Sequence, residues 1–423
     1  MTNRNYEDGL VELSAGRLER AAACFAEAIK RQPRDLYAYN KLALVYREQG
    51  QPKKAVRVLK AALKLKEDDL YTHYILGSAY LDDQDYEGAL KEFERASQID
   101  PADSYTLNAM AQVFRELKEL PRAAQVLEHA VTVDEGDPYT HNHLALVRVE
   151  MGRYDQALTI LQKALERAPE NPLLHATLGD LYHGLGDDAK ARDRFEYLVR
   201  RHGNTKLGHV GLAHIEMTSG RYEEAVQCLL RALALDEADA SVHLSLGECY
   251  RQLNELEQAE RHYDHAHQID PAAVGPLTSL GEVYERQGLI LKAHEAYGEA
   301  VRRAPKSGYA HYLLGRLYMA QKMFPKAEAS LRAAAGLDPR DRYSRNALGF
   351  LRLVAADFDE AEEVFRQVLD VRPDDDYALL HLAKALLGSR KPEDARVMLR
   401  RVMELGQASA YYSQARELAE ALG

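Results

Sequence analysis

An alanine recurs every 34 residues along almost the whole chain, and no other feature constrains the fold as strongly. These alanines are Ala21, Ala55, Ala89, Ala123, Ala157, Ala191, Ala225, Ala259, Ala293, Ala327, Ala361 and Ala395. A glycine or alanine stands 12 residues before each of them, and a large apolar residue stands four residues after each. The chain is therefore predicted to consist of twelve copies of one unit, which stack on one another instead of surrounding a single central core.

The spacing inside each unit predicts two helices. In residues 70–103, Gly77 and Tyr80 share one face of a first helix, and Ala89 and Phe93 share one face of a second. Small residues at fixed places let two helices approach closely, and large ones from the neighbouring helix fill the remaining space. We therefore expect an all-α solenoid of antiparallel helix pairs.

The prolines and glycines agree with this register. All 14 prolines fall at expected helix boundaries, where the missing N–H does not break a helix. Six glycines stand between the two helices of a unit, where the backbone needs a positive φ: Gly16, Gly50, Gly152, Gly186, Gly220 and Gly288.

The pattern of Leu-Gly, Tyr, Ala, an aromatic or Leu, Ala and then Pro resembles the tetratricopeptide repeat (TPR), over residues 2–409. The resemblance implies a right-handed superhelix whose first helices line its concave side. We expect repeats 1–6 in residues 2–205, repeats 7–12 in residues 206–409, and a polar capping helix in residues 410–423.

Three departures from the repeat pattern lead to further expectations. Polar residues in the first copy, Asn5, Asp8 and Glu12, favour an N-terminal cap. The glycine-rich stretch 201–211 has no closing proline, which favours a softer joint there. Charged residues replace the usual aromatic at Glu12, Arg148, Glu216 and Arg352; such groups must pair, reach solvent or loosen the packing, and a ligand role for either arginine is the alternative.

Composition and motifs exclude several functional classes. The net charge of −11 and the pI of about 5.8 oppose nucleic-acid binding. No apolar stretch resembles a signal peptide or a membrane span, and three cysteines without a CxxC motif suit a reducing compartment, so we expect a cytoplasmic protein. There is no Walker A, GxSxG or HExxH motif, so we predict neither an enzyme nor a cofactor.

The histidines are predicted to pack and not to bind metal. His73, His141, His175, His209, His243 and His311 occupy the bulky place of first helices. Equivalent atoms of neighbouring repeats lie about 8–10 Å apart, which is too far for a shared metal ion. The denser group His262, His265 and His267 offers two ligands on one face, fewer than a structural zinc site needs.

The remaining candidate surface is the concave groove that the resemblance implies. Tyrosine recurs at the second place of the repeat and asparagine at the fifth, and both residue types suit a protein-binding surface. The predicted partner-binding residues in repeats 2–5 are Tyr37, Asn40, Arg47, Tyr71, Tyr74, Tyr105, Asn108, Arg115, Tyr139 and Asn142. Those in repeats 10–12 are Tyr309, Tyr312, Arg316, Tyr343, Asn346, Phe350, Tyr377 and Lys384. The alternative is that the tyrosines pack between adjacent first helices.

The predicted function is a scaffold or adaptor that binds partner proteins or extended peptide segments. The family's carboxylate clamp needs Lys at the fifth place and Asn at the ninth, whereas this chain has Asn40 and Leu44, which opposes chaperone-tail binding. The alternative function is a repeat subunit that recruits substrates to a separately encoded enzyme or assembly machine, of glycosyltransferase, pilus or secretion type. O-GlcNAc transferase repeats favour Asn at the sixth place, where Lys41, Ile75 and Ala109 stand here. The sequence names neither the partner nor the oligomeric state.

Overall fold

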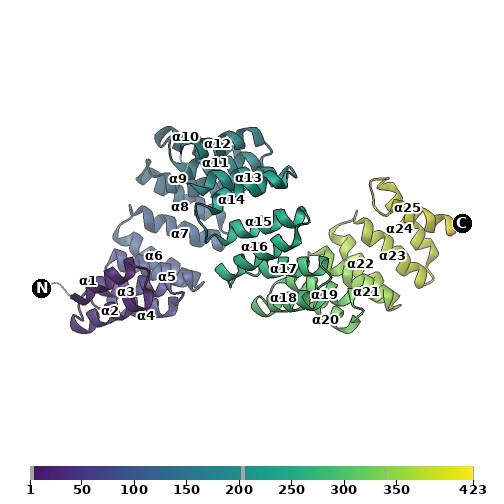
Figure 1. Cartoon of the computed structure of the whole chain (residues 1–423), viewed down its shortest axis with the longest axis horizontal. Coiled ribbons are helices and arrows are strands. Elements are labelled where there is room, and N and C mark those ends of the chain that lie inside the picture. The colour runs from purple at the N-terminus through teal and green to yellow at the C-terminus, as the bar shows by residue number, and fades with distance from the viewer. Residues whose placement is uncertain (1–3, 202–204, 339, 423) are drawn as a thin grey trace. The chain divides into compact units, whose positions relative to one another are not determined.

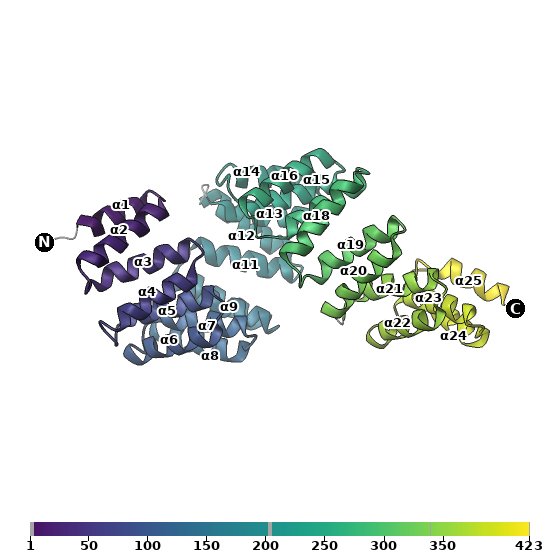
Figure 2. The ribbon, with the colours of Figure 1, turned by 90° about the horizontal axis from the view of Figure 1, so that it is seen from below.

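The computed structural model describes residues 4–201, 205–338 and 340–422, and these form 25 α-helices and no strand. The helices pack into two units, Met1–Ile215 and Glu216–Gly423. In each unit, consecutive helices run antiparallel and each pair stacks on the next (Figures 1 and 2). The predicted all-α solenoid of helix pairs is confirmed.

Odd-numbered helices up to α23 are the first helices of the repeats, and even-numbered helices are the second. Their bounds in the first unit are α1 (Arg4–Ser14), α2 (Leu18–Arg31), α3 (Leu36–Glu48), α4 (Pro52–Leu63), α5 (Leu70–Asp82), α6 (Tyr86–Ile99), α7 (Ser104–Glu116), α8 (Leu120–Val133), α9 (Pro138–Glu150), α10 (Tyr154–Arg167), α11 (Pro172–Gly184) and α12 (Asp188–Arg201). Helix α13 (Lys206–Thr218) spans the boundary between the units.

The second unit continues the same alternation and adds one terminal helix. Its bounds are α14 (Tyr222–Leu233), α15 (Ala240–Gln252), α16 (Leu256–Ile269), α17 (Gly275–Arg286), α18 (Ile290–Arg303), α19 (Gly308–Ala320), α20 (Phe324–Leu337), α21 (Arg342–Val354), α22 (Phe358–Val371), α23 (Asp376–Gly388), α24 (Pro392–Glu404) and α25 (Tyr412–Ala421). The predicted capping helix is α25, whose Ala415 is buried and whose Leu418 packs against the last repeat. The predicted division after residue 205 and the joint at 201–211 stay predictions, and residues 202–204 of that joint lie outside the described residues.

The small residue of each first helix lies against the large residue of the second helix in the same repeat. Glycine there accompanies an aromatic ring in six repeats: Gly9–Phe25, Gly77–Phe93, Gly179–Phe195, Gly247–Tyr263, Gly281–Tyr297 and Gly349–Phe365. A Cβ atom on these glycines would stand 2.2 to 2.8 Å from the ring. Alanine at the same place accompanies leucine in five repeats, and Gly315 with Leu331 is the exception. The two positions therefore share a nearly constant volume, as close packing requires.

Polar side chains, mostly aspartates, cap the starts of most first helices. In nine first helices of the described residues, the preceding side chain accepts a hydrogen bond from a main-chain N–H of the first turn. These caps are Asp35, Asp69, Asp103, Asp137, Asn171, Asp239, Ser307, Asp341 and Asp375. All six first helices that carry an exposed tyrosine near their start, α3, α5, α7, α9, α19 and α21, are capped in this way.

The turn between the helices of a repeat is the same whether or not it contains glycine. The six predicted glycines have φ between 66° and 79°. At the equivalent place, six other residues have φ near 60°: Gln84, Lys118, Asn254, Lys322, Ala356 and Arg390. The helix pair therefore imposes the left-handed conformation on residues that disfavour it.

The charged residues that replace the usual aromatic are paired. Glu12 contacts Arg17, Arg148 contacts Glu128, Glu216 contacts Arg221, and Arg352 contacts Glu328 and Glu360. Of the three alternatives expected for these groups, namely pairing, reaching solvent or looser packing, the structure shows pairing. Of the histidines at the bulky place, His73, His141, His175, His209 and His243 are buried and His311 is half-buried.

Within the described residues, no helix exceeds 14 residues, and none has the length and apolar character that a bilayer crossing needs.

Candidate partner-binding surfaces

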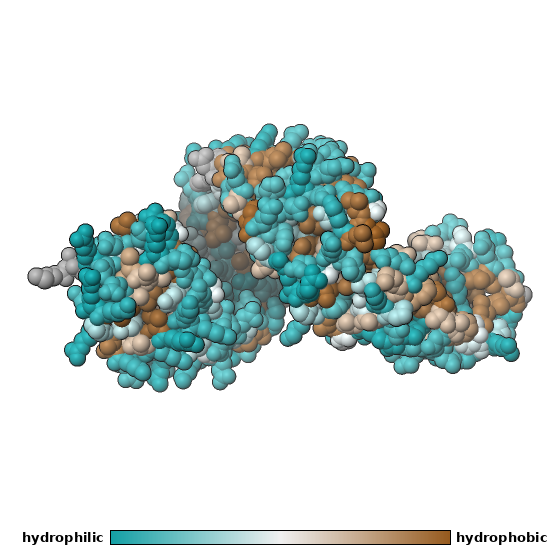
Figure 3. All heavy atoms as spheres, turned by 60° about the horizontal axis from the view of Figure 1, so that its bottom comes forward, coloured by the Kyte–Doolittle hydropathy of each residue, from teal (hydrophilic) through white to brown (hydrophobic). Residues whose placement is uncertain are grey.

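Six tyrosines at the starts of first helices are open to solvent. Tyr37, Tyr71, Tyr105, Tyr139, Tyr309 and Tyr343 are 47% to 74% exposed, whereas Tyr377 is half-buried. Two of them also contact a neighbouring first helix, because Tyr309 donates to Glu282 at 2.7 Å and Tyr343 lies against Tyr312. Figure 3 shows hydrophobic residues gathered in several patches among hydrophilic ones on the face that it draws.

The predicted asparagines lie deeper than the tyrosines. Asn40 and Asn142 are both 3% exposed, and the Asn40 amide makes a hydrogen bond of 3.1 Å with the Thr72 hydroxyl of the next first helix. Asn108 Nδ2 donates to the Thr140 hydroxyl at 2.7 Å in the same way. Repeat stacking thus encloses Asn40 and Asn142 and engages Asn40 and Asn108 in contacts between first helices, and a role of these amides in partner binding stays a prediction.

The predicted arginines join neighbouring first helices. Arg47 Nε lies 2.6 Å from Asp82 Oδ2, Arg115 contacts Glu150, and Arg316 lies 2.5 Å from Glu285. These side chains are between a quarter and a half exposed, so the pairs contribute little to stability. They do hold the arginine heads in place on the surface formed by the first helices.

A hollow of about 500 Å³ lies between α5, α7 and α9, and we call it the α5–α9 hollow. Its lining contains four of the predicted residues, Tyr74, Tyr105, Asn108 and Tyr139. It also contains six residues that were not predicted: Ser104, Ala109, Gln112, Asp134, Asp137 and His143. The sequence places His143 one residue after Asn142, but its inward direction depends on the stacking of α7 against α9.

A directed chain of hydrogen bonds orients His143. The Ser104 carbonyl can only accept, so Asn108 Nδ2 faces it at 2.8 Å and Asn108 Oδ1 faces His143 Nδ1 at 2.9 Å. His143 Nδ1 therefore donates. Burial, together with Arg115, lowers the pKa of His143, so the ring is neutral near pH 7 and its Nε2 is an acceptor.

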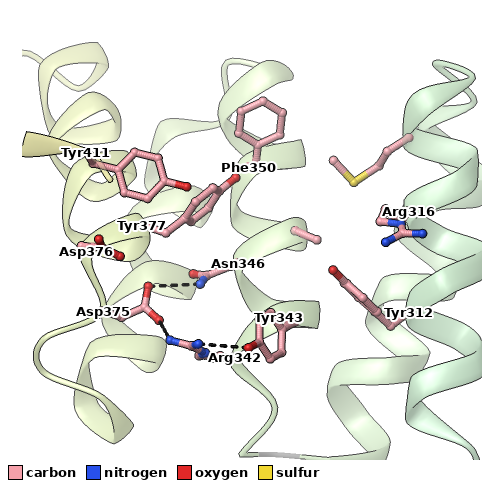
Figure 4. Close-up of a pocket in the computed structure, with 12 residues that line it drawn as sticks. Tyr312, Arg316, Arg342, Tyr343, Asn346, Phe350, Asp375, Asp376, Tyr377 and Tyr411 are labelled. Carbon is pink, nitrogen blue, oxygen red and sulfur yellow. Dashed lines mark hydrogen bonds and ion pairs between the residues drawn. The ribbon is translucent and has the colours of Figure 1, made fainter. Parts of the chain in front are cut away.

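A second hollow of about 460 Å³ lies between α19, α21, α23 and α25, and we call it the α19–α25 hollow. It gathers six predicted residues: Tyr312, Arg316, Tyr343, Asn346, Phe350 and Tyr377. Figure 4 shows Tyr377 and Tyr411 together on one side and Tyr312 and Arg316 across from them. Ring centroids are 5.7 Å apart for Tyr377 and Tyr411 and 6.3 Å apart for Tyr312 and Tyr343, both within the range of attractive ring contacts.

A polar frame that the sequence analysis missed supports this hollow (Figure 4). Asp375, whose side chain is 2% exposed, accepts from Arg342 at 3.0 Å, from Asn346 at 3.3 Å and from the Ala378 main-chain N–H at 2.9 Å. The recurrence of Asp before first helices could have identified Asp375 as a helix cap. Its link to Arg342, 33 residues earlier, follows only from the stacking of two repeats.

Lys384 is the one predicted residue of repeat 12 that does not line the α19–α25 hollow, and its side chain is half-buried. Burial lowers the pKa of the Lys384 amine. The remaining predicted residues, Tyr37, Asn40, Arg47, Tyr71, Arg115, Asn142, Tyr309 and Lys384, lie outside both hollows.

The buried side chain of His381 is expected to make the stability of the second unit depend on pH. It is 6% exposed and stacks on Tyr377 with centroids 4.0 Å apart. Burial lowers its pKa to about 4, below the usual value near 6.5. Because the unfolded chain then binds the proton first, the free energy of unfolding should fall as pH drops through this interval.

Equilibrium urea denaturation at about pH 7 and about pH 5 measures this loss. His381→Phe should lose less stability between the two pH values than the wild type, and the exposed His129→Phe should behave as the wild type. Equal losses for all three proteins would contradict the assignment to His381.

Comparisons with known protein families identify tetratricopeptide repeats along the chain. Models described as "Tetratricopeptide repeat" match residues 80–146, 148–215 and 353–419, residues 6–69, 40–104 and 278–342, and residues 240–273, and a "TPR repeat" model matches 213–253. No curated protein matches the chain.

Solved structures with a similar fold include yeast Tom70, with 17% identity, 99% of this chain and 95% of that chain covered, and a TM-score of 0.50. The APC/C hetero-tetramer Cut9–Hcn1 matches with 16% identity, coverage of 98% and 95%, and a TM-score of 0.47. A tetratricopeptide repeat protein from Parabacteroides merdae matches with 18% identity, coverage of 58% and 97%, and a TM-score of 0.49. At these identities, the likeness to yeast Tom70 concerns the fold alone.

Proposed function

This chain belongs to the tetratricopeptide repeat family, and on that premise we propose that it is a non-catalytic scaffold that binds other proteins through the surface of its first helices. The observation that supports the proposal most directly is the row of exposed tyrosines at the starts of first helices. Tyrosine offers a large rigid contact area and a hydroxyl, and it is enriched among the residues that dominate binding energy.

The framework beneath these tyrosines is suited to a rigid binding surface. The Asn40–Thr72 and Asn108–Thr140 hydrogen bonds and the Arg47–Asp82 pair join successive first helices. A surface held in this way loses little conformational entropy when a partner binds. The tyrosines thus project from a preorganised base.

The repeat spacing favours an extended segment as the partner. Adjacent first helices lie about 8–10 Å apart, and an extended chain rises about 3.3 Å per residue. A partner segment that crosses successive first helices therefore meets a new tyrosine about every third residue. Such a segment would fill the α5–α9 hollow between Tyr105 and Tyr139.

Removal of two exposed rings should weaken partner binding and leave the fold intact. Tyr105→Ala with Tyr139→Ala is expected to lower the affinity for a captured partner at least about tenfold, because truncated aromatic anchors each cost about 1 kcal/mol or more. Asn108 is left unchanged because it bonds to both Ser104 and Thr140.

The measurement is a pull-down from the source cells, followed by titration of each purified partner against the wild type and the variant. The matched control is Tyr154→Ala. It also removes an exposed tyrosine, but from the start of α10, which is the second helix of its repeat. Circular dichroism checks that both variants remain helical. If the double variant binds every partner as tightly as the control does, the first-helix surface of repeats 3–5 is not the binding site.

A further inference from the structure

The α5–α9 hollow carries a negative charge that its own lining does not balance. Asp134 and Asp137 belong to the lining, and no lysine or arginine of the described residues does. Asp134 accepts from the Gly136 main-chain N–H at 2.9 Å, and Asp137 accepts from main-chain N–H groups in the first turn of α9. These donors are neutral, so the charge of the two carboxylates remains uncompensated.

The arginines of the neighbouring surface are already paired. Arg115 adds to the burial that lowers the pKa of His143, but its guanidinium contacts Glu150. Arg47 lies 2.6 Å from Asp82 in the same way. Each of these pairs is neutral as a whole, so neither offsets the two carboxylates of the hollow. The whole chain has a formal net charge of −11, and such a field attracts a cationic partner before contact.

The α19–α25 hollow differs in its balance of charge. Its lining contains Arg316 and Arg342 together with Asp375 and Asp376 (Figure 4). Two cations and two carboxylates cancel there. Of the two hollows, it is therefore the α5–α9 hollow whose charge favours a cationic guest.

The aromatic part of the α5–α9 lining also suits a cation. Tyr105 and Tyr139 are 73% and 63% exposed, and Tyr74 adds a third ring from α5. The faces of tyrosine rings attract ammonium and guanidinium groups. A basic side chain has an apolar stem and a charged head, so its stem can pack against the rings while its head reaches the carboxylates.

His143 supplies an accessible acceptor in the same lining. Its Nδ1 donates to Asn108, so the neutral ring has Nε2 as its acceptor. No described residue donates to Nε2, and this atom is open to solvent. An ammonium or guanidinium group has donors only, so it can bond to Nε2 without bringing an unpaired acceptor into the hollow.

We propose that the α5–α9 hollow binds the positively charged side chain of an arginine or a lysine in an extended segment of a partner protein. This inference rests on the proposed scaffold function and names the kind of side chain that the first unit selects. A neutral guest would leave the two carboxylates unpaired, and an acidic guest would be repelled by them.

The probes are short acetylated and amidated peptides of alanine and serine with one variable residue at the centre. Arginine is compared with citrulline, which has nearly the same shape without the charge, and lysine is compared with Nε-acetyl-lysine. Saturation-transfer NMR titrations at low salt measure the affinity of each peptide for the full chain. In at least one pair, the basic peptide should bind about fivefold more tightly than the neutral one, the effect of one cation–π contact. Added salt should reduce this preference.

Asp134→Asn removes one carboxylate and keeps the oxygen that accepts from Gly136, so the preference should fall to about twofold. The matched control is Asp270→Asn, which removes the same charge from the chain. Asp270 has the same place in its repeat and accepts from the Ala272 main-chain N–H at 3.0 Å, but it lines neither hollow. That variant should keep the wild-type preference. Both aspartates are exposed, so neither change should affect folding.

Equal affinity for the basic and the neutral peptide in both pairs would overturn the proposal, as would equal preferences of Asp134→Asn and Asp270→Asn. The double variant Tyr105→Ala with Tyr139→Ala connects this test to the proposed function. If it loses partner binding while the wild type shows no preference for basic peptides, the assignment of a basic side chain is wrong and the scaffold function stands. If partner binding does not depend on these tyrosines, the proposed function is wrong, and this inference with it.

Discussion

Gly77→Ala is expected to lower the free energy of unfolding by about 1–3 kcal/mol, although alanine is the better helix former. The new Cβ would stand 2.6 Å from the Phe93 ring, which is fully buried and cannot move aside without disturbing its own neighbours. The gain in helix propensity, about 1 kcal/mol, offsets only part of this overlap.

Phe93→Leu should restore much of the loss. Five repeats of this chain, among them Ala43 with Leu59 and Ala111 with Leu127, combine alanine with leucine at the same two places. Urea denaturation of the two single variants and the double variant gives the coupling, expected at about 0.5–3 kcal/mol for residues in direct contact. The reciprocal change, Ala43→Gly with Leu59→Phe, is the control. Strictly additive effects would show that the two positions do not share a volume.

Asp375→Ala is expected to lower the free energy of unfolding by about 2–4 kcal/mol, since it removes a helix cap and leaves buried polar groups without a partner. The carboxylate caps α23 through the Ala378 N–H and accepts from Arg342 and Asn346. Without it, the Asn346 amide nitrogen is buried and unsatisfied.

The matched control is Asp103→Ala, which removes the same cap from α7. Asp103 accepts from the main chain and the hydroxyl of Thr106 and pairs with no cation of the described residues, so its loss should cost about 1 kcal/mol. Urea denaturation of both variants separates the contribution of the helix cap to stability from that of the contacts with Arg342 and Asn346. Equal losses would show that the Arg342 and Asn346 contacts add nothing to stability.

The two variants also differ in their expected effect on the α19–α25 hollow. Asp375→Ala should disturb its lining, because Arg342 and Asn346 lose the group that orients them, whereas Asp103→Ala should leave it unchanged. The α19–α25 hollow thus depends on a residue that the repeat pattern marks only as a cap.

Local features of this protein followed from the period alone. The 34-residue spacing predicted the helix pairs, the burial of Ala89 and Phe93, and the turns at Gly16 and Gly50, because these depend on contacts within one repeat. The same spacing did not predict that Gln84 or Ala356 would adopt a positive φ, since side-chain preference argues against it. The packing of the helix pair outweighs that preference.

Residues that act between repeats were much harder to predict. The tyrosines at the second place were found because their type and spacing are visible in the sequence. Asn40 and Asn108 were expected to face a partner, but each bonds to a threonine 32 residues later. No local pattern distinguishes an amide that faces a groove from one that joins two helices, because the difference depends on the offset between stacked repeats.

The amino-acid sequence by itself determined the class of fold, the helix boundaries and the row of tyrosines, since residues within about 30 positions of one another set those features. Only the tertiary structure decided which of these side chains surround a hollow and that Arg342 and Asn346 share the Asp375 carboxylate. The physical reason is that hydrogen-bond direction and the space between stacked helices depend on how one repeat sits on the next, and the spacing of residue types does not encode that geometry.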